Sequence, residues 1–438
     1  MTQAEPAAAA QTTQDTMQTT SSQAALPKVA VILLWYPLFT QPFIFRDVEG
    51  LKNHLPTEVY TLYGLNLRLC SKEMQAQASS ASRLGVKALP AILCSALKFF
   101  AKSPKRFCSL FAEHVCRRWP SLEVLGENLW AFLAGVHLAP VLQQRQITCL
   151  YAPWPRGTTT AARVVHDITG IPYITCVRAN NLRPADPDLV DKMKAACLIR
   201  TNNQADEKRI HALAPDAEVE VIYNCLTLHV DSLAPVRMDK PVKLLACGRF
   251  DVTKGFDILL QALAILRKKS VPFHLTLVGG GGKMMGLGGM GTSIHELCSS
   301  LKLDDCVSFP GLISHDAFPE ILKAHDIFLA PCVVAKDGQC DGIPNTLIEA
   351  MSFGLPVVAS SVNAIPEIVH HQKTGLLVPQ RDPEALASAI AELVANPDAA
   401  REYGKNGAAL AGELFSPEKN GALLADLFIK SQACRADS

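Results

Sequence analysis

Short runs of aliphatic and β-branched residues recur along the chain, separated by segments long enough for a helix. The first run, KVAVILLWYP, starts at Lys28 and ends in proline, a pattern typical of a strand buried on both faces of a sheet. Comparable runs follow at 58–63, 147–154, 172–177, 197–202 and 219–224. Strands that alternate with helices in this way predict a doubly wound parallel sheet.

The same pattern restarts after an unpatterned, proline-containing stretch at 228–241. Five further runs, KLLACGRF, HLTLVGG, CVSFPG, IFLAPC and PVVASS, predict a second parallel sheet. We therefore expect two Rossmann-like α/β domains, at 27–232 and 240–405, that face each other across a cleft. Residues 406–438 contain the run NGALLADLFIK and are expected to form a C-terminal helix that returns to the N-terminal domain.

Composition agrees with two globular domains, because 438 residues with 49% hydrophobic content exceed the size of one ordinary core. The net charge of +1 gives no general attraction to nucleic acid, which we exclude as the main partner. The 14 cysteines include no CxxC pair and no zinc-type spacing, so they indicate a reducing cytoplasm and no metal site. Residues 1–26 lack the pattern of a secretion signal and are expected to form a disordered tail.

The stretch DGIPNTLIEAM places two acids, Asp341 and Glu349, on either side of the start of a short predicted helix. Pro344 fits the first turn, and Asn345 or Thr346 is expected to cap the helix. A helix amino terminus carries partial positive charge and unpaired N–H groups, which suit a phosphate. Two acids around a bound diphosphate fit the hydroxyl groups of a nucleotide sugar.

The same stretch resembles the acid-x7-acid motif of retaining family 4 glycosyltransferases, which have the GT-B fold. CGRFDVTKG, at 247–255, resembles the family segment in which an arginine and a lysine neutralise the donor diphosphate. WYPLFTQPFIFRDVEGL and DPDLVDKM look like the colanic-acid and exopolysaccharide branch of that family. The resemblance extends over residues 28–425.

The resemblance implies a role for each matching residue. Glu349 is expected to hold the donor ribose hydroxyls, and Asp341 to contact the transferred sugar as a catalytic residue. Arg249 and Lys254 are expected to stabilise the departing nucleoside diphosphate. With these two cations and a helix dipole present, the expected reaction uses no metal and no cofactor beyond the nucleotide-diphosphate sugar itself.

Several backbone positions are also expected near the donor. Because Pro344 lacks an N–H group, Ile343 and Asn345 are expected to supply the backbone contact to the diphosphate. Three glycines are expected to allow the backbone close to the nucleotide: Gly248, Gly279 and Gly280. The rest of the glycine-rich insertion, at 281–291, receives no role.

The sequence departs from the family pattern in CVRANN, where Arg178 stands at the position of the usual histidine. Arginine stays protonated, so it cannot act as a base. We expect Arg178 to act in the catalytic cleft by binding a phosphate or an acidic sugar; the alternative is a structural ion pair. Asp341 and Pro344 also differ from the usual glutamate and glycine.

Residues 83–118 contain eight basic residues against one acid, Glu113, interleaved with apolar residues. This pattern predicts peripheral contact with an anionic membrane, where lipid-linked acceptors lie. The alternative is a helix packed on the domain with a solvated basic face. The apolar run at 128–144 is too short and too interrupted for a spanning helix.

These observations predict a cytoplasmic glycosyltransferase, and peripheral contact would hold it at the inner face of the membrane. Its acceptor would be a lipid-linked oligosaccharide or a surface polysaccharide. Two alternatives stay open: a GT-B nucleotide-sugar epimerase, which turns over without an acceptor, and a degenerate scaffold that binds a nucleotide sugar without turnover.

Overall fold

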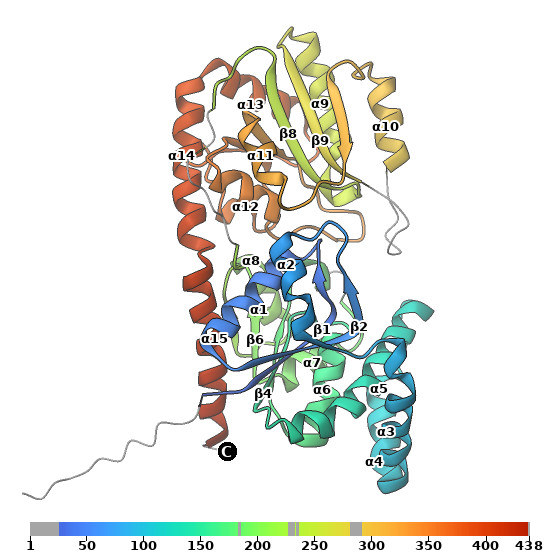
Figure 1. Ribbon diagram of the computed structural model, residues 1–438. Helices are drawn as coiled ribbons and strands as arrows, with labels where there is room; N and C mark the ends of the chain where they lie inside the picture. Colours follow the sequence, from blue (N-terminus) through green and yellow to red (C-terminus); the bar gives the residue numbers. More distant parts are fainter. Residues whose placement is uncertain (1–25, 183–184, 227–232, 234–235, 281–290, 437–438) are drawn as a thin grey trace, which may run out of the picture.

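The computed structural model describes residues 26–182, 185–226, 233, 236–280 and 291–436. Within these ranges the chain folds into two α/β domains, each built on one parallel sheet (Figure 1). The predicted tail and the glycine-rich insertion lie, apart from one residue each, outside the described residues.

The N-terminal sheet has seven strands in the order β3-β2-β1-β4-β5-β6-β7, and every pair is parallel. Its strands are β1 Val29–Leu38, β2 Thr57–Asn66, β3 Ala81–Arg83, β4 Cys149–Ala152, β5 Tyr173–Cys176, β6 Leu198–Thr201 and β7 Val219–Val221. Each strand except β3 coincides with a predicted run, and β1 and β2 extend beyond the ends of theirs. Every residue of β4, β5 and β6 is buried, because helices cover both faces of the sheet.

Helices connect these strands and cover the sheet. They are α1 Pro42–His54, α2 Lys72–Ala76, α3 Leu89–Lys102, α4 Pro104–His114, α5 Leu122–Gln144, α6 Thr158–Thr169, α7 Leu189–Ala195 and α8 Gln204–Leu213. Helices α3, α4 and α5 pack together at one side of the domain (Figure 1). Within the described ranges, α5 is long and apolar enough to cross a membrane. Half of its most apolar stretch is buried in the protein, as in an ordinary core helix.

The C-terminal sheet has six parallel strands in the order β10-β9-β8-β11-β12-β13. Its strands are β8 Val242–Arg249, β9 Phe273–Gly280, β10 Val307–Gly311, β11 Ile327–Ala330, β12 Val357–Ser360 and β13 Leu376–Val378. Its helices are α9 Phe256–Lys268, α10 Gly291–Ser300, α11 Phe318–Lys323, α12 Asn345–Ser352 and α13 Pro383–Ala395. The two parallel sheets confirm the predicted fold class.

The strand order reverses beside the first strand of each domain, between β1 and β4 and between β8 and β11. Ligands of open α/β sheets bind outside the carboxyl ends of the strands at such a switch point. The loop after β1 and the loop after β8 are therefore the places to look for a site.

The last two helices, α14 Pro397–Leu414 and α15 Pro417–Ala436, run along one side of both domains (Figure 1). The run predicted at 420–430 is the middle of α15, which packs on α1. A methyl group added at Gly50 in α1 would lie 3.1 Å from the Cα atom of Gly421. The two glycines thus allow these helices to approach closely.

The predicted capping of α12 is wrong. Pro344 is the residue before the helix, with extended backbone angles, and no side chain caps the first turn. Thr346 instead donates its hydroxyl to the Cys247 carbonyl of β8 at 3.2 Å, and Asn345 accepts a hydrogen bond from Asn224 of the N-terminal domain. Both side chains hydrogen-bond to residues that are distant in the sequence, so the spacing along the chain does not reveal these contacts.

Candidate active site

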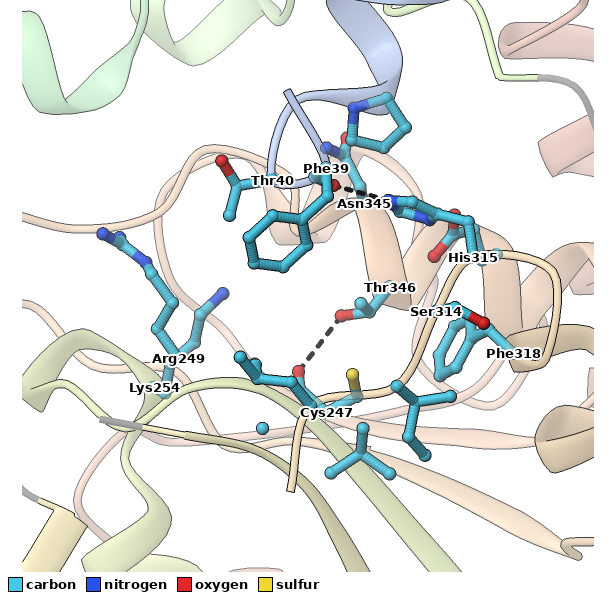
Figure 2. A pocket seen from close by; sticks show the side chains of 17 residues that line it. Phe39, Thr40, Cys247, Arg249, Lys254, Ser314, His315, Phe318, Asn345 and Thr346 are labelled. Carbon is cyan, nitrogen blue, oxygen red and sulfur yellow. Dashed lines mark hydrogen bonds between the residues drawn. The ribbon is translucent and has the colours of Figure 1, made fainter. Parts of the chain in front are cut away.

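A cavity of about 250 Å³ opens between the domains at the carboxyl edge of the C-terminal sheet. We call it the Glu349 chamber. Its walls come from the end of β8, the start of α12, the loop after β10 and the loop between β1 and α1. Figure 2 shows Arg249 and Lys254 together on one side of this chamber, with Phe39 and Thr40 of the N-terminal domain near them.

A second cavity, of about 390 Å³, adjoins the first, and we call it the Arg178 chamber. Asp341 lies in its wall, together with Phe43 and Trp154 of the N-terminal domain. Four residues line both chambers: Thr40, Arg249, Lys254 and Asn345. The two cations therefore lie where the chambers meet.

Lys254 forms an ion pair with Asp341, with 3.1 Å between Nζ and Oδ2. Burial alone would lower the pKa of Lys254, but Asp341, Cys332 and Asp251 together outweigh burial and raise it. The lysine therefore stays charged. Gly248 makes room for its stem, because a methyl group there would lie 3.0 Å from the Lys254 Cε atom.

Arg249 is the last residue of β8, and its side chain is 44% exposed. Its Nη2 atom lies 3.1 Å from Oδ2 of Asp251. Asp251 also accepts a hydrogen bond from the Thr253 backbone N–H at 2.9 Å, which fixes the turn that leads to Lys254. The turn thus holds Arg249 and Lys254, the two cations predicted to bind the diphosphate, at the chamber junction.

Glu349 lies in α12 and lines the Glu349 chamber. Burial raises the pKa of its carboxyl group from 4.5 to about 8. The charged form is therefore disfavoured at neutral pH until a ligand supplies polar contacts.

Arg178 is buried, with 7% of its surface exposed. Its guanidinium lies over the rings of Phe43 and Trp154, with the Cζ atom 4.6 and 5.0 Å from the ring centroids. Its Nη1 atom donates to Asn224 at 3.2 Å, and Nη2 lies 3.6 Å from a carboxylate oxygen of Asp47. These contacts match the structural alternative, whereas its place in the chamber wall agrees with a role toward a ligand, which stays a prediction.

Asp47 is shared between two arginines. The fully buried Arg200 of β6 donates to both of its oxygens, at 2.6 and 3.2 Å, and also to the Tyr151 hydroxyl at 2.8 Å. One carboxylate therefore faces two guanidinium groups, and the wall near Arg178 carries an excess of positive charge.

Three of the four remaining predicted residues line a chamber, and one does not. Ile343 lies in the wall of the Arg178 chamber, and Gly248 and Gly279 lie in the wall of the Glu349 chamber. Gly280 ends β9 but is not among the described residues that line either chamber. The sequence did not assign Phe39, Thr40, Trp154 or His315, although the first two fall within the WYPLFTQPF stretch.

Hydrogen bonds across the cleft hold the domains together. Glu367 of the C-terminal domain accepts from the backbone N–H groups of Gln204 and Ala205, at 3.1 and 2.9 Å, at the start of α8. The Tyr223 hydroxyl donates to the same carboxylate at 2.9 Å. On the other side of the cleft, the His315 ring donates from Nε2 to the Phe39 carbonyl (Figure 2).

Residues 241–396 match a known family profile, the family described as Glycosyl transferases group 1. Residues 241–396 belong to this glycosyltransferase family. The glycosyltransferase domain contains every predicted site residue except Arg178, which lies in the N-terminal domain.

Curated glycosyltransferases also show similarity to this chain. The chain is 33% identical over 156 residues to the amylovoran biosynthesis glycosyltransferase AmsK of Erwinia amylovora, a match that covers 36% of this chain and 37% of AmsK. The chain thus spans little more than a third of the length of this relative.

Solved structures extend the similarity to both domains. Sucrose-phosphate synthase of Thermosynechococcus elongatus superposes with a TM-score of 0.71 at 19% identity, over 93% of this chain and 100% of the other. HepE of Anabaena, in complex with UDP, gives a TM-score of 0.68 at 15% identity, over 92% of this chain and 100% of the other. The fold of the chain is therefore GT-B.

Proposed function

We propose that the protein is a retaining hexosyltransferase that moves a sugar from a nucleoside-diphosphate donor to a glycan acceptor. The arrangement of the two chambers carries this proposal, because they meet at Arg249 and Lys254. A diphosphate at the junction places the nucleoside in the Glu349 chamber and the sugar in the Arg178 chamber, beside Asp341. The complex of HepE with UDP supports a nucleotide donor for this fold.

The proposed chemistry needs positive charge at the junction. The bond between the anomeric carbon and the diphosphate breaks, and an acceptor hydroxyl forms a new bond to that carbon on the same face. Its proton passes to an oxygen of the leaving diphosphate. Arg249, Lys254 and the amino terminus of α12 stabilise the charge that grows on the diphosphate, so the step needs no metal ion.

Glu349 and Asp341 have separate tasks in this proposal. Glu349 accepts hydrogen bonds from the donor ribose, and Asp341 binds hydroxyls of the transferred sugar while holding Lys254 in place. Ile343 and Asn345 offer backbone N–H groups to the diphosphate at the start of α12, since Pro344 has none.

Arg178 is proposed to set the preference for the group bound in its chamber. Because Asp47 already pairs with Arg200, the positive charge of Arg178 is only partly balanced. A carboxylate or phosphate on the sugar or on the acceptor would neutralise the remaining positive charge of Arg178. A lipid-linked or polysaccharide acceptor is proposed, in line with the role of AmsK in amylovoran biosynthesis.

The test is a titration of the purified protein with nucleoside diphosphates and their sugars, with and without a chelator, followed by thermal unfolding. A donor that binds the folded state raises the melting temperature. We expect stabilisation by one nucleotide class regardless of chelator, and its loss in Lys254→Ala.

Turnover assays then separate the alternatives. Sugar transfer that requires an added acceptor supports the proposal, and retention is read from the anomeric configuration of the product. Conversion of the donor without an acceptor identifies an epimerase instead. Binding without any turnover, unchanged in Glu349→Gln, identifies a scaffold.

A further inference from the structure

An apolar stripe is exposed along α3 and the short helical turn before it, Val86–Ala88. Five side chains form this stripe and are exposed by the following fractions: Val86 84%, Leu89 37%, Leu93 45%, Leu97 68% and Phe100 44%. They recur every three or four residues, so they share one face of the helix. An exposed apolar face of this length marks a surface for interaction.

The face of α3 that adjoins the stripe is an ordinary packed face. Ile92 and Ala96 are buried where α3 meets α5. The apolar residues of the next helix also turn inward, because Phe107 and Phe111 of α4 pack edge-on against Phe132 of α5. The phenylalanines of α4 therefore pack inward. Phe100, at the end of the stripe, packs edge-on against Phe107 with 5.5 Å between the ring centroids, so the exposed remainder of the stripe is Val86, Leu89, Leu93 and Leu97.

Exposed basic side chains occur along the same helical segment, close to the stripe in sequence. Lys87, Lys98, Lys102 and Lys105 are exposed, and no ion pair involves them within the described part of the chain. Helix α3 contains no acidic residue. The acid of α4, Glu113, is paired with Arg163, so it does not offset the lysines.

We propose that the stripe docks this protein on the surface of an anionic lipid bilayer. Valine and leucine side chains enter the boundary between headgroups and acyl chains, while the lysines extend to the lipid phosphates. A second copy of the chain fits less well, because a symmetric contact of this surface with itself would bring the lysines of both copies together.

This surface is independent of the proposed transfer reaction, since none of its residues lines either chamber. Docking would bring the protein to acceptors carried on lipids. Failure of the sugar-transfer assays and failure of docking are therefore separate results.

The test is co-sedimentation of the full chain with vesicles. Vesicles of equal parts phosphatidylglycerol and phosphatidylcholine are compared with vesicles of phosphatidylcholine alone. We expect binding to the anionic vesicles, at least tenfold weaker binding to the neutral ones, and progressive loss of binding as salt is added.

Two double variants and matched controls locate the contact. Leu93→Ser with Leu97→Ser should weaken binding at least tenfold, whereas Leu423→Ser with Ile429→Ser, which alters exposed side chains of α15, should not. Lys98→Gln with Lys102→Gln should weaken binding about tenfold or more, whereas Lys268→Gln with Lys269→Gln, also exposed, should not.

Thermal unfolding of each variant verifies that the fold is kept. No binding of the wild-type chain to anionic vesicles at low salt overturns the proposal. Equal binding by the stripe variant and its α15 control also overturns it, and so does a concentration-dependent dimer that only the stripe variant loses.

Discussion

At the scale of single residues, Glu349 links the site to the stability of the fold. Its carboxyl has a pKa of about 8 in the folded chain and an ordinary value of 4.5 when solvated. Between these values the folded state holds a proton that the unfolded state has lost, so rising pH lowers the free energy of unfolding. The stabilisation that the protonated Glu349 gives to the folded state is fully present below pH 4.5 and is lost by about pH 8.

Glu349→Gln should remove this dependence, because glutamine carries no charge at any pH. Above pH 8 the variant should be more stable than the wild type by up to ~5 kcal/mol, and near pH 4 the two should be alike. Urea unfolding across this pH range measures the difference. Glu402→Gln, at an exposed position of α14, is the control and should leave the pH profile unchanged. Parallel profiles for wild type and Glu349→Gln would refute the burial argument.

At the scale of elements, the pairing of β8 with β9 depends on Gly279. Its φ angle is +145°, and a methyl group there would lie 1.9 Å from the carbonyl oxygen of Gly248. Gly279→Ala should therefore push the two strands apart beside Lys254 and cost about 2–5 kcal/mol of stability. Gly280→Ala is the matched control, since its methyl group would meet Leu312 at an ordinary 3.8 Å and should change stability by less than about 0.5 kcal/mol. Equal unfolding midpoints in urea for the two variants would contradict this account.

The strands and the segments around the site show how much of the structure could be predicted from the sequence. The long apolar runs gave the strands correctly, because a strand buried on both faces must be apolar throughout. The edge strands β3 and β13 were missed, since each has three residues, whereas the equally short β7 was found because it lies within a longer apolar run. DGIPNTLIEAM, a loop and the start of α12, and CGRFDVTKG, the end of β8 and the turn after it, are each continuous in sequence, so their place in the chamber walls could be predicted. Thr40 and Trp154 could not be assigned, because their place in the walls depends on how the two domains meet.

At the scale of the whole molecule, Glu367 acts across the cleft. Its carboxylate accepts two N–H groups at the positive end of α8 and one hydroxyl from Tyr223, and all three donors belong to the other domain. Charged hydrogen bonds at a helix amino terminus are stronger than neutral ones. The carboxylate therefore favours the closed arrangement, in which Thr40 and Lys254 line the same chambers.

Glu367→Gln should keep the shape of this contact but remove its charge, which weakens closure by about 1–2 kcal/mol. We expect a larger radius of gyration in X-ray scattering of the ligand-free protein and donor affinity lower by about five- to tenfold. Tyr223→Phe, which deletes one hydrogen bond of three, should shift both quantities in the same direction by less. Glu402→Gln alters a carboxylate of equal charge away from the cleft and should shift neither. If Glu367→Gln scattered and bound donor like the wild type, closure would have to rest on the other contacts across the cleft, such as that of His315 with Phe39.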